Sequence, residues 1–600
     1  MAARPNKFSR ALSVLPVLRN VPAAAWLANY SKAQLSADLL AACIVTVMLI
    51  PQSLAYAMLA GLPPELGLYA SIWPLVLYAV FGSSRTLSVG PVAVASLMTA
   101  AAVASVVEQG LADPVTAAIA LSFISGVFLM LMGFLRLGFM ANFLSHGVVS
   151  GFITASAILI ALSQFKHMLG IPLHGDTLWE LGAGIVHNVA NSHTITVILG
   201  TTVLAFLVWG RRRGAVLLQR LGITPSGAQL LVRAAPVVGV LATIAVANLF
   251  QLEAQGVALV GEIPSGLPSF TAELPSFALL QALFVPALMI AIIGYVESIS
   301  VGLTLAAKRR QQINANHELL GLGAANLASG FSGAFPVTGG FSRSVVNFDA
   351  GAATQMASVF TALGIALASL WLTPFLYFLP KATLAATIIF AVVALVDFSI
   401  FKKTWGFSRA DFWAVTVTAV LTLLLGVEIG VTAGIATSIG LFIYRGATPH
   451  MAEVGRVAGT EHFRNRERYQ VETQPHVLML RVDESLFFAN ASALAQTVHN
   501  AVYQRDNISD VVLVCTAINT IDYSALETLE AINTRLASQG VRLHLCEIKG
   551  PVIDALNKTP FFQYLSGAVY LSQNEAFNAL TKPTQVEHMN SQPTHREDAQ

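Results

Sequence analysis

Long apolar runs, separated by short polar connections, occupy residues 37–445. A helix needs about 20 apolar residues to cross a bilayer, and a bare hydropathy count gives roughly ten to twelve such spans. With the shorter runs included, the pattern predicts fourteen spans, near 38–60, 67–82, 86–107, 114–138, 142–166, 193–210, 230–252, 279–307, 316–335, 338–352, 354–373, 377–396, 410–426 and 428–445. We therefore expect a polytopic α-helical membrane protein.

The composition agrees with this expectation and excludes other classes. Of 600 residues, 11% are charged and 55% are hydrophobic, whereas a soluble domain carries about 25% charged residues. A single soluble enzyme, a disordered chain and a coiled coil are excluded. Cys43, Cys515 and Cys546 are too few and too scattered for a disulfide framework or a metal cluster. We expect no enzymatic activity, no cofactor, no metal and no nucleic-acid partner.

The charges predict the topology. Lys and Arg gather in the N-terminal segment and the even-numbered connections, such as Arg211–Arg213 after span 6 and Lys308–Arg310 after span 8. The odd-numbered connections are mostly acidic, with Lys381 as an exception. The positive-inside rule then places both termini in the cytoplasm. The expected location is the cell membrane, or the inner membrane if the protein is bacterial.

The acidic residues also mark a domain boundary, because 15 of the 32 Asp and Glu lie in residues 1–445 and 17 in the rest. We predict a cytoplasmic N-terminal segment (1–35), a transmembrane domain (36–446), a linker (447–474), an α/β domain (475–582) and a disordered tail (583–600). In the α/β domain the expected strands are 477–482, 486–489, 510–515 and 541–547, and the expected helices are 492–504, 523–538 and 552–556.

Two spans interrupted by Gly and Pro suggest an internal repeat. Residues 86–97 and 336–347 align without a gap at an offset of 250, so that Gly90 meets Gly340 and Val92 meets Ser342. Spans 3 and 10 are seven apart, which predicts a 7+7 inverted repeat. Two facing half-helix starts would offer free N–H groups and about +0.5 charge each, which suits an anion. Close helix packing explains the same Gly and Pro residues equally well.

Three polar residues lie deep in predicted spans. They are Gln52 in span 1, Glu297 in span 8 and Arg343 in span 10. Charges inside a membrane are expensive and are functional candidates. The alternative is that Glu297 and Arg343 only pair with each other.

Several motifs resemble those of one transporter family. Pro63–Ser71 (PPELGLYAS), Phe81–Arg85 (FGSSR) and Val89–Pro91 (VGP) resemble the sulfate permease (SulP) signature, although Leu66 replaces its usual Tyr. The segments at 51–58 and 340–344 fit as well, and Ile518–Leu526 resembles a STAS domain. The resemblance covers roughly residues 30–580. It implies a core domain (spans 1–4 and 8–11), a gate domain (spans 5–7 and 12–14), elevator-like alternating access and a homodimer.

The resemblance also implies a site between the starts of spans 3 and 10. The matching substrate-binding residues are Gln52, Tyr56, Pro91, Val92, Gly340, Phe341, Ser342 and Arg343. Sodium-coupled bicarbonate relatives place an Asp at position 297 and Thr at positions 301 and 341, where this chain has Glu297, Val301 and Phe341. Glu297 is therefore expected to carry a proton. In the STAS segment, Asp522 and Ser524 are possible regulatory residues, although Tyr523 stands beside the Asp.

The leading hypothesis is a secondary transporter that takes up sulfate, or a related small anion such as bicarbonate or a dicarboxylate, together with protons. A sodium-coupled bicarbonate transporter and a chloride/bicarbonate exchanger stay open as alternatives. A STAS-based regulatory or scaffold protein is the alternative from another class. The expected partners are the anion, protons, the lipid bilayer, a second copy of the chain and a cytoplasmic regulator of the STAS domain.

The topology is testable by cysteine labelling in a chain whose native cysteines are replaced. A cysteine in the 255–270 connection is expected to react with an impermeant thiol reagent added outside, and a cysteine at 211–213 is not. The reverse labelling pattern would show that the predicted topology is wrong.

Overall fold

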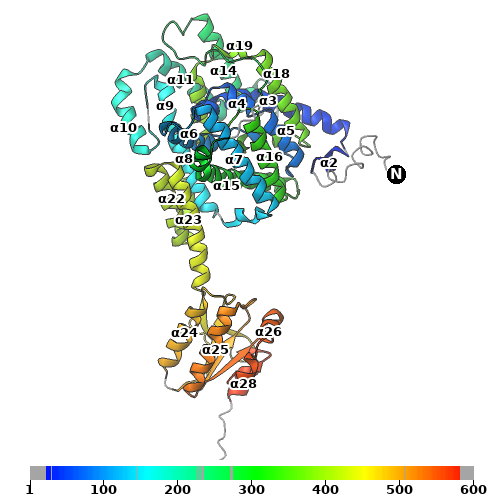
Figure 1. Cartoon of the computed structure of the whole chain (residues 1–600), viewed down its shortest axis with the longest axis vertical. Coiled ribbons are helices and arrows are strands. Elements are labelled where there is room, and N and C mark those ends of the chain that lie inside the picture. Colours follow the sequence, from blue (N-terminus) through cyan, green and yellow to red (C-terminus); the bar gives the residue numbers. More distant parts are fainter. Residues whose placement is uncertain are drawn as a thin grey trace, which may run out of the picture. The chain divides into compact units, whose positions relative to one another are not determined.

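The computed structural model describes residues 22–581 except 29, 144, 174, 226, 227, 229–231, 233, 234, 271–274 and 506. The predicted tail (583–600) lies outside these residues, as does most of the predicted N-terminal segment. The chain forms two compact units, one ending at Ile439 and one beginning at Gly440, and each is described by itself (Figure 1).

The first unit is helical, and its helices follow the order of the predicted spans. Its main helices are α3 (Lys32–Leu59), α4 (Glu65–Tyr69), α5 (Trp73–Phe81), α6 (Ala93–Glu108), α7 (Pro114–Phe134), α8 (His146–Ser163), α9 (Phe165–Leu169), α11 (Thr194–Trp209), α12 (Ala215–Arg220), α14 (Ala235–Leu249), α15 (Phe277–Lys308), α16 (Ala315–Phe331), α17 (Phe341–Asp349), α18 (Met356–Trp371), α20 (Lys381–Val393) and α22 (Arg409–Leu425). Helix α23 (Val427–Ala447) begins in this unit and continues past its end at Ile439. Within the described residues, five helices are long and apolar enough to cross a membrane, and five shorter stretches are also apolar. The number fourteen stays a prediction.

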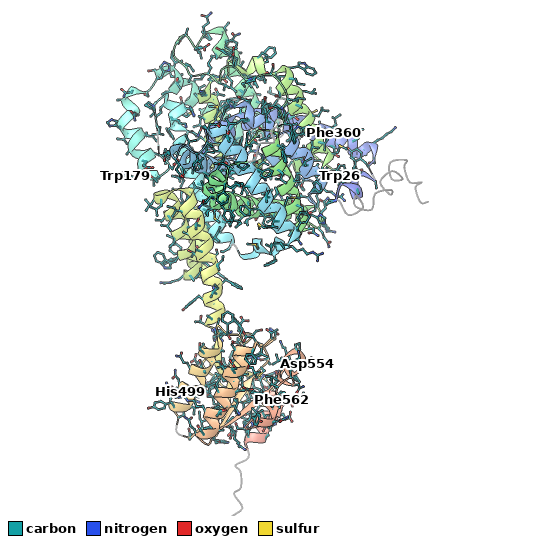
Figure 2. The ribbon with its side chains drawn as sticks, viewed as in Figure 1. Trp26, Trp179, Phe360, His499, Asp554 and Phe562 are labelled. Carbon is teal, nitrogen blue, oxygen red and sulfur yellow. The ribbon has the colours of Figure 1, made fainter. Side chains whose placement is uncertain are left out.

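Short helices occur before the first predicted span and in the connections between spans. They are α2 (Pro22–Leu27), α10 (Leu178–Asn188), α19 (Thr373–Leu376) and α21 (Ser399–Phe407). Thr177 and Glu180 form a capping box at the start of α10, which stabilises a helix end. Trp179 on α10 is 79% exposed (Figure 2), and tryptophan is favoured at the membrane–water interface.

The helices of this unit pack in two groups. The core group contains α3–α7 and α15–α18, in which α16 packs on α7 and α5, and α18 and α17 pack on α3. The gate group contains α8, α9, α11, α12, α14 and α20–α23, in which α22 packs on α8 and α20 packs on α11 and α9. The groups follow the expected core and gate, and they also contact each other, through α3 and α20 and through α6 and α8.

Glycines allow close contact between α7 and α16 in the core group. A Cβ on Gly126 of α7 would lie 2.7 Å from the backbone nitrogen of Leu327, and one on Gly323 of α16 would lie 2.7 Å from Met130. Such small residues let membrane helices approach closely. Figure 1 shows α7 and α16 side by side.

The two interrupted spans meet in a short antiparallel pair. Strand β1 (Val89–Gly90) pairs with β2 (Thr338–Gly339), with Val89 opposite Gly339. These two residues are separated by the same offset of 250 that aligns the repeats, so each pairs with its own repeat equivalent. An antiparallel pair of this kind is expected where the pseudo-two-fold axis of an inverted repeat passes.

A buried carboxylate fixes the loop that leads into β1. Glu318 on α16 accepts hydrogen bonds from the Tyr78 hydroxyl (2.6 Å), the Ser83 backbone (2.8 Å) and hydroxyl (2.7 Å), and the Ser84 backbone (2.9 Å). Glu318 is fully buried. Ser83 and Ser84 belong to the Phe81–Arg85 motif. A residue that is distant in the sequence therefore holds this motif in place.

A second buried carboxylate fixes the loop that follows α17. Asp38 on α3 accepts hydrogen bonds from the backbone of Ala353 (2.6 Å) and from the backbone (3.0 Å) and hydroxyl (2.6 Å) of Thr354. The next residue, Gln355, donates to the carbonyls of Ser84 (2.6 Å) and Leu87 (2.9 Å). The segments flanking the two interrupted spans are therefore tied together by buried hydrogen bonds.

The second unit is a six-stranded sheet with helices. The strand order is β4 (Phe463–Asn465), β3 (Met451–Arg456), β5 (Val477–Val482), β6 (Asp510–Val514), β7 (Arg542–Cys546) and β8 (Val569–Tyr570). Strands β5 to β8 are parallel, and β3 is antiparallel to β4 and β5. The helices are α24 (Ala491–Tyr503), α25 (Tyr523–Ser538), α26 (Gly550–Leu556), α27 (Phe561–Tyr564) and α28 (Gln573–Thr581).

Two predictions for this unit need correction. The expected strand at 486–489 is wrong: only Leu486 makes a bridge, to Ile521, because the Asn490 side chain accepts the N–H of Phe487 (3.0 Å) and closes a turn. The expected linker at 447–474 contains β3 and β4, which extend the sheet by antiparallel pairing.

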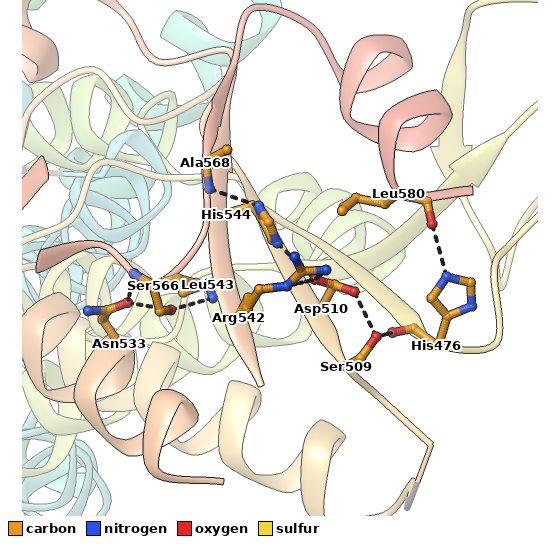
Figure 3. A network of polar contacts seen from close by, with 10 residues as sticks. All are labelled: His476, Ser509, Asp510, Asn533, Arg542, Leu543, His544, Ser566, Ala568 and Leu580. Carbon is orange, nitrogen blue, oxygen red and sulfur yellow. Dashed lines mark hydrogen bonds and ion pairs between the residues drawn. The ribbon is translucent and has the colours of Figure 1, made fainter. Parts of the chain in front are cut away.

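A polar network ties the middle of this sheet to its edge (Figure 3). The carboxylate of Asp510 accepts from His544 Nε2 (2.9 Å) and from Arg542 (2.8 Å), and the Ala568 N–H donates to His544 Nδ1 (2.9 Å). This arrangement places the imidazole hydrogen on Nε2. Burial raises the pKa of Asp510, but the hydrogen bonds from His544 and Ser509 and the nearby Arg542 outweigh it, so the pKa lies below its ordinary value.

The Glu318 hydrogen bonds are testable by substitution. In Glu318→Gln one carboxylate oxygen becomes an amide that cannot accept, which leaves buried donors unsatisfied at about 1–3 kcal/mol each. We expect a lower thermal unfolding midpoint in detergent than for the wild type. Glu262→Gln, which changes an exposed carboxylate, serves as the matched control. An unchanged midpoint in Glu318→Gln would contradict the proposed role of this residue.

Candidate functional site

Helices α6 and α17 begin directly after the β1–β2 pair. Their N-cap residues, Val92 and Gly340, have extended backbone and make no side-chain capping hydrogen bond. The first N–H groups of a helix need partners from outside the helix, and its N-terminus carries about +0.5 charge. Two helix ends that favour an anion are therefore brought together inside the core group.

Arg343, in the first turn of α17, links the two interrupted spans. Its side chain is 2% exposed, and its Nη1 donates to the carbonyl of Pro91 at 2.8 Å. Among the described residues, neither its Nε nor its Nη2 has a hydrogen-bond partner. A buried guanidinium with two free nitrogens is expected to bind an anion, because buried unpaired donors are costly.

Glycines make the room that Arg343 occupies. A Cβ on Gly90 would lie 3.0 Å from Nη1, and one on Gly340 would lie 2.9 Å from Nε. Gly90 also has a φ of 156°, which residues with a side chain rarely adopt. Both glycines of the pair found by the repeat alignment thus lie next to the guanidinium.

A cavity of about 550 Å³ adjoins these helix ends, between the core and gate groups. Gln52 and Tyr56 of α3, and Phe341 and Ser342 of α17, line its core side. Pro91, Val92, Gly340 and Arg343 are buried behind this wall. The structure thus brings the eight predicted substrate-binding residues to one region, four of them on the cavity surface.

Glu297 lies close enough to Arg343 for their charges to interact, on the same boundary between the core and gate groups. It lines a separate cavity of about 20 Å³, which is surrounded mostly by apolar residues of α6, α8, α15, α22 and α23. In the part of the chain that the structure describes, no ion pair joins Glu297 to Arg343. The neighbouring Ser298 accepts the N–H of Gly339 at 2.8 Å, so helix α15 holds β2 directly.

The predicted regulatory residues lie at the start of α25. One oxygen of Asp522 accepts the N–H of Ala525 and the other that of Phe488, both at 2.8 Å. Asp522 therefore caps the helix and holds the loop before α24. Ser524 is exposed in the first turn of α25.

Arg211 is a residue of the cavity wall that the sequence analysis used only for topology. It lines the 550 Å³ cavity on the gate side, together with Thr387 and Phe390 of α20. The sequence shows a cluster of three arginines at the end of a predicted span. It does not show which of the three faces the cavity.

Comparisons with known proteins agree with the motifs. The family model described as "Sulfate permease family" matches residues 35–418, and the STAS domain model matches residues 468–576. The chain is 33% identical to "Sulfate transporter 4.1, chloroplastic" of Arabidopsis thaliana, over 91% of this chain and 82% of that protein. A probable sulfate transporter of Mycobacterium tuberculosis is also 33% identical, over 88% of this chain and 92% of that protein.

Solved structures share the fold. The murine Solute Carrier 26 family member A9 anion transporter, in the inward-facing state, superposes with a TM-score of 0.83 at 22% identity, covering 97% of this chain and 96% of that chain. The transmembrane domain of a cyanobacterial bicarbonate transporter gives 0.56 at 22% identity, covering 67% of this chain and 98% of that one. These matched proteins are named as transporters, in agreement with the expectation that the chain is not an enzyme. By its motifs, its fold and the family model, the chain belongs to the sulfate permease family and carries a C-terminal STAS domain.

Proposed function

We propose that the protein is a secondary transporter that takes up sulfate, or a related small anion, with protons by an elevator-like movement of the core group against the gate group. The observation that carries this proposal is the buried Arg343, whose Nε and Nη2 have no partner among the described residues. Arg343 lies at the starts of two helices, beside a cavity of about 550 Å³. Multi-pass anion transport is the coarse function that the family membership supports.

The charge at the helix ends favours a dianion. Two helix ends supply about +0.5 each and Arg343 supplies +1, giving a sum of about +2. Sulfate would neutralise this sum, and a singly charged anion would leave about half of it. The relatives named as sulfate transporters support the same choice.

The environment of Glu297 supports coupling to protons. Val94 of α6 and Phe152 of α8 lie at the same small cavity, so the carboxylate stands where the core group meets the gate group. A charged carboxylate is costly against apolar walls. Movement of the core group past the gate group is therefore easier when Glu297 is protonated.

Proton and anion binding are then linked. With Glu297 ionised, the sum of charges falls from about +2 to about +1. A dianion binds better to the protonated form, and by reciprocity the proton binds better when the dianion is present. Both ligands are therefore expected to bind before the core group moves.

The substrate role of Arg343 is testable by Arg343→Ala. The variant removes charge-assisted hydrogen bonds worth about 1.5–3 kcal/mol, so the half-saturation concentration for sulfate uptake into proteoliposomes should rise by about tenfold or more. Arg85→Ala, which changes an exposed arginine of the neighbouring loop, is the control and should behave as the wild type. Unchanged affinity in Arg343→Ala would place the site elsewhere.

The coupling role of Glu297 is testable by its pH profile. Wild-type sulfate uptake should rise as the external pH falls and should not depend on sodium. Uptake by Glu297→Gln should not vary with pH, because the amide carries no titrating proton. Glu108→Gln, an exposed carboxylate variant on α6, should keep the wild-type profile. Sodium-driven uptake at constant pH, or full pH dependence in Glu297→Gln, would refute proton coupling through this residue.

A further inference from the structure

Three consecutive arginines interrupt the helix that crosses the gate group. Residues Gly210–Gly214 (GRRRG) form a π-helical turn, η4, between α11 and α12. Such turns occur rarely inside α-helices and are frequent at functional sites. Arg211, Arg212 and Arg213 share this turn and the same charge, yet their surroundings differ.

Arg211 is set apart by the cavity. It lines the 550 Å³ cavity that contains Gln52, Tyr56 and Ser342. Its guanidinium carbon lies 5.7 Å from the ring centre of Phe390, which lines the same cavity. Arg212 and Arg213 do not line it.

The charge of Arg211 is not balanced within the cavity. Among the described residues that form the wall, Arg211 is the charged one, and none is Asp or Glu. No ion pair among the described residues involves Arg211. A positive charge at the mouth of a cavity with apolar walls raises the local concentration of anions.

Arg211 and Ser342 belong to opposite walls. Ser342 lies in the first turn of α17 in the core group, whereas Arg211 lies in the gate group. By the predicted topology, the connection after span 6 is cytoplasmic, so Arg211 marks the cytoplasmic end of the cavity. An anion that leaves the helix starts toward the cytoplasm passes this guanidinium.

We propose that Arg211 is a second anion-binding position at the cytoplasmic end of the cavity, which receives an oxyanion from the helix-start site on Arg343 and releases it to the cytoplasm. The planar guanidinium suits the paired oxygens of sulfate or a carboxylate. Without an anion, its cation–π contact with Phe390 holds it at the wall. The inference rests on the proposed function and assigns a direction of release to it.

The arginine cluster supplies its own matched control. Arg211→Gln and Arg212→Gln remove the same charge from the same turn, but only the first changes the cavity wall. The test measures exchange of radiolabelled sulfate in right-side-out and inverted membrane vesicles, which expose opposite faces of the protein. Thermal unfolding midpoints in detergent confirm that each variant is folded.

We expect Arg211→Gln to raise the half-saturation concentration at the cytoplasmic face by about tenfold, as for loss of a charged hydrogen-bond partner. The value at the external face should stay unchanged, and Arg212→Gln should match the wild type at both faces. Arg211→Lys should recover part of the affinity because it keeps the charge.

Two results would overturn the inference. Equal changes of the half-saturation concentration in Arg211→Gln and Arg212→Gln would show that Arg211 acts only as one of several surface charges. Equal changes at both faces in Arg211→Gln would place Arg211 in the main site. If the wild type exchanges chloride or bicarbonate but no sulfate, the proposed substrate fails, and the same comparison with that anion still decides the role of Arg211.

Discussion

A positively charged guanidinium inside a membrane protein has to be compensated, and the compensation of Arg343 shapes the rest of the site. The Pro91 carbonyl satisfies one nitrogen of this group, and two nitrogens have no partner among the described residues. Irregular backbone at membrane depth is tolerated where protein buries it or where it lines a cavity. The β1–β2 pair meets this condition, because its residues are buried in the protein and its two strands form hydrogen bonds with each other. The two helix ends that follow it are left to bind an anion.

The support of the site is built from buried polar groups in the core group. Glu318 holds the loop before β1, Asp38 holds the loop after α17, and Gln355 joins these two loops. Ser298 of α15 holds β2 next to Glu297. The loops that carry the two helix starts are therefore tied into the core group and should move with it, which an elevator-like mechanism requires of its binding site. In the proposed mechanism, the anion would leave the core group through the cavity that Arg211 lines.

Much of this arrangement could be predicted from the sequence. Apolar runs predicted the order of the helices, and the offset of 250 between Gly90 and Gly340 predicted an inverted repeat with two facing helix starts, because hydrophobic length and backbone breaks are local properties. The β1–β2 pair itself was not predicted. Arg343 and Glu297 were identified because charges at membrane depth are rare. Gln52 was identified by its depth in span 1, and the family resemblance supplied Tyr56.

Other features depend on contacts between distant segments and could not be predicted. The role of Glu318 appears only when α16 meets the loop at Ser83, and the cavity position of Arg211 depends on the direction of a side chain within a turn. The strand β3 was missed because its pairing with β5 comes from sheet geometry. The turn at Asn490 replaced a strand because a side-chain carbonyl satisfied the local backbone, which apolar patterning does not reveal.

The central claim is that an oxyanion binds between the starts of α6 and α17 against Arg343. Selenate has the shape and charge of sulfate, and its selenium gives an anomalous X-ray signal. A crystal structure of the protein soaked with selenate tests the claim most directly. The account predicts an anomalous peak within hydrogen-bonding reach of Ser342 and the free nitrogens of Arg343. A fully occupied peak elsewhere in the transmembrane unit, with none at these helix starts, would contradict it.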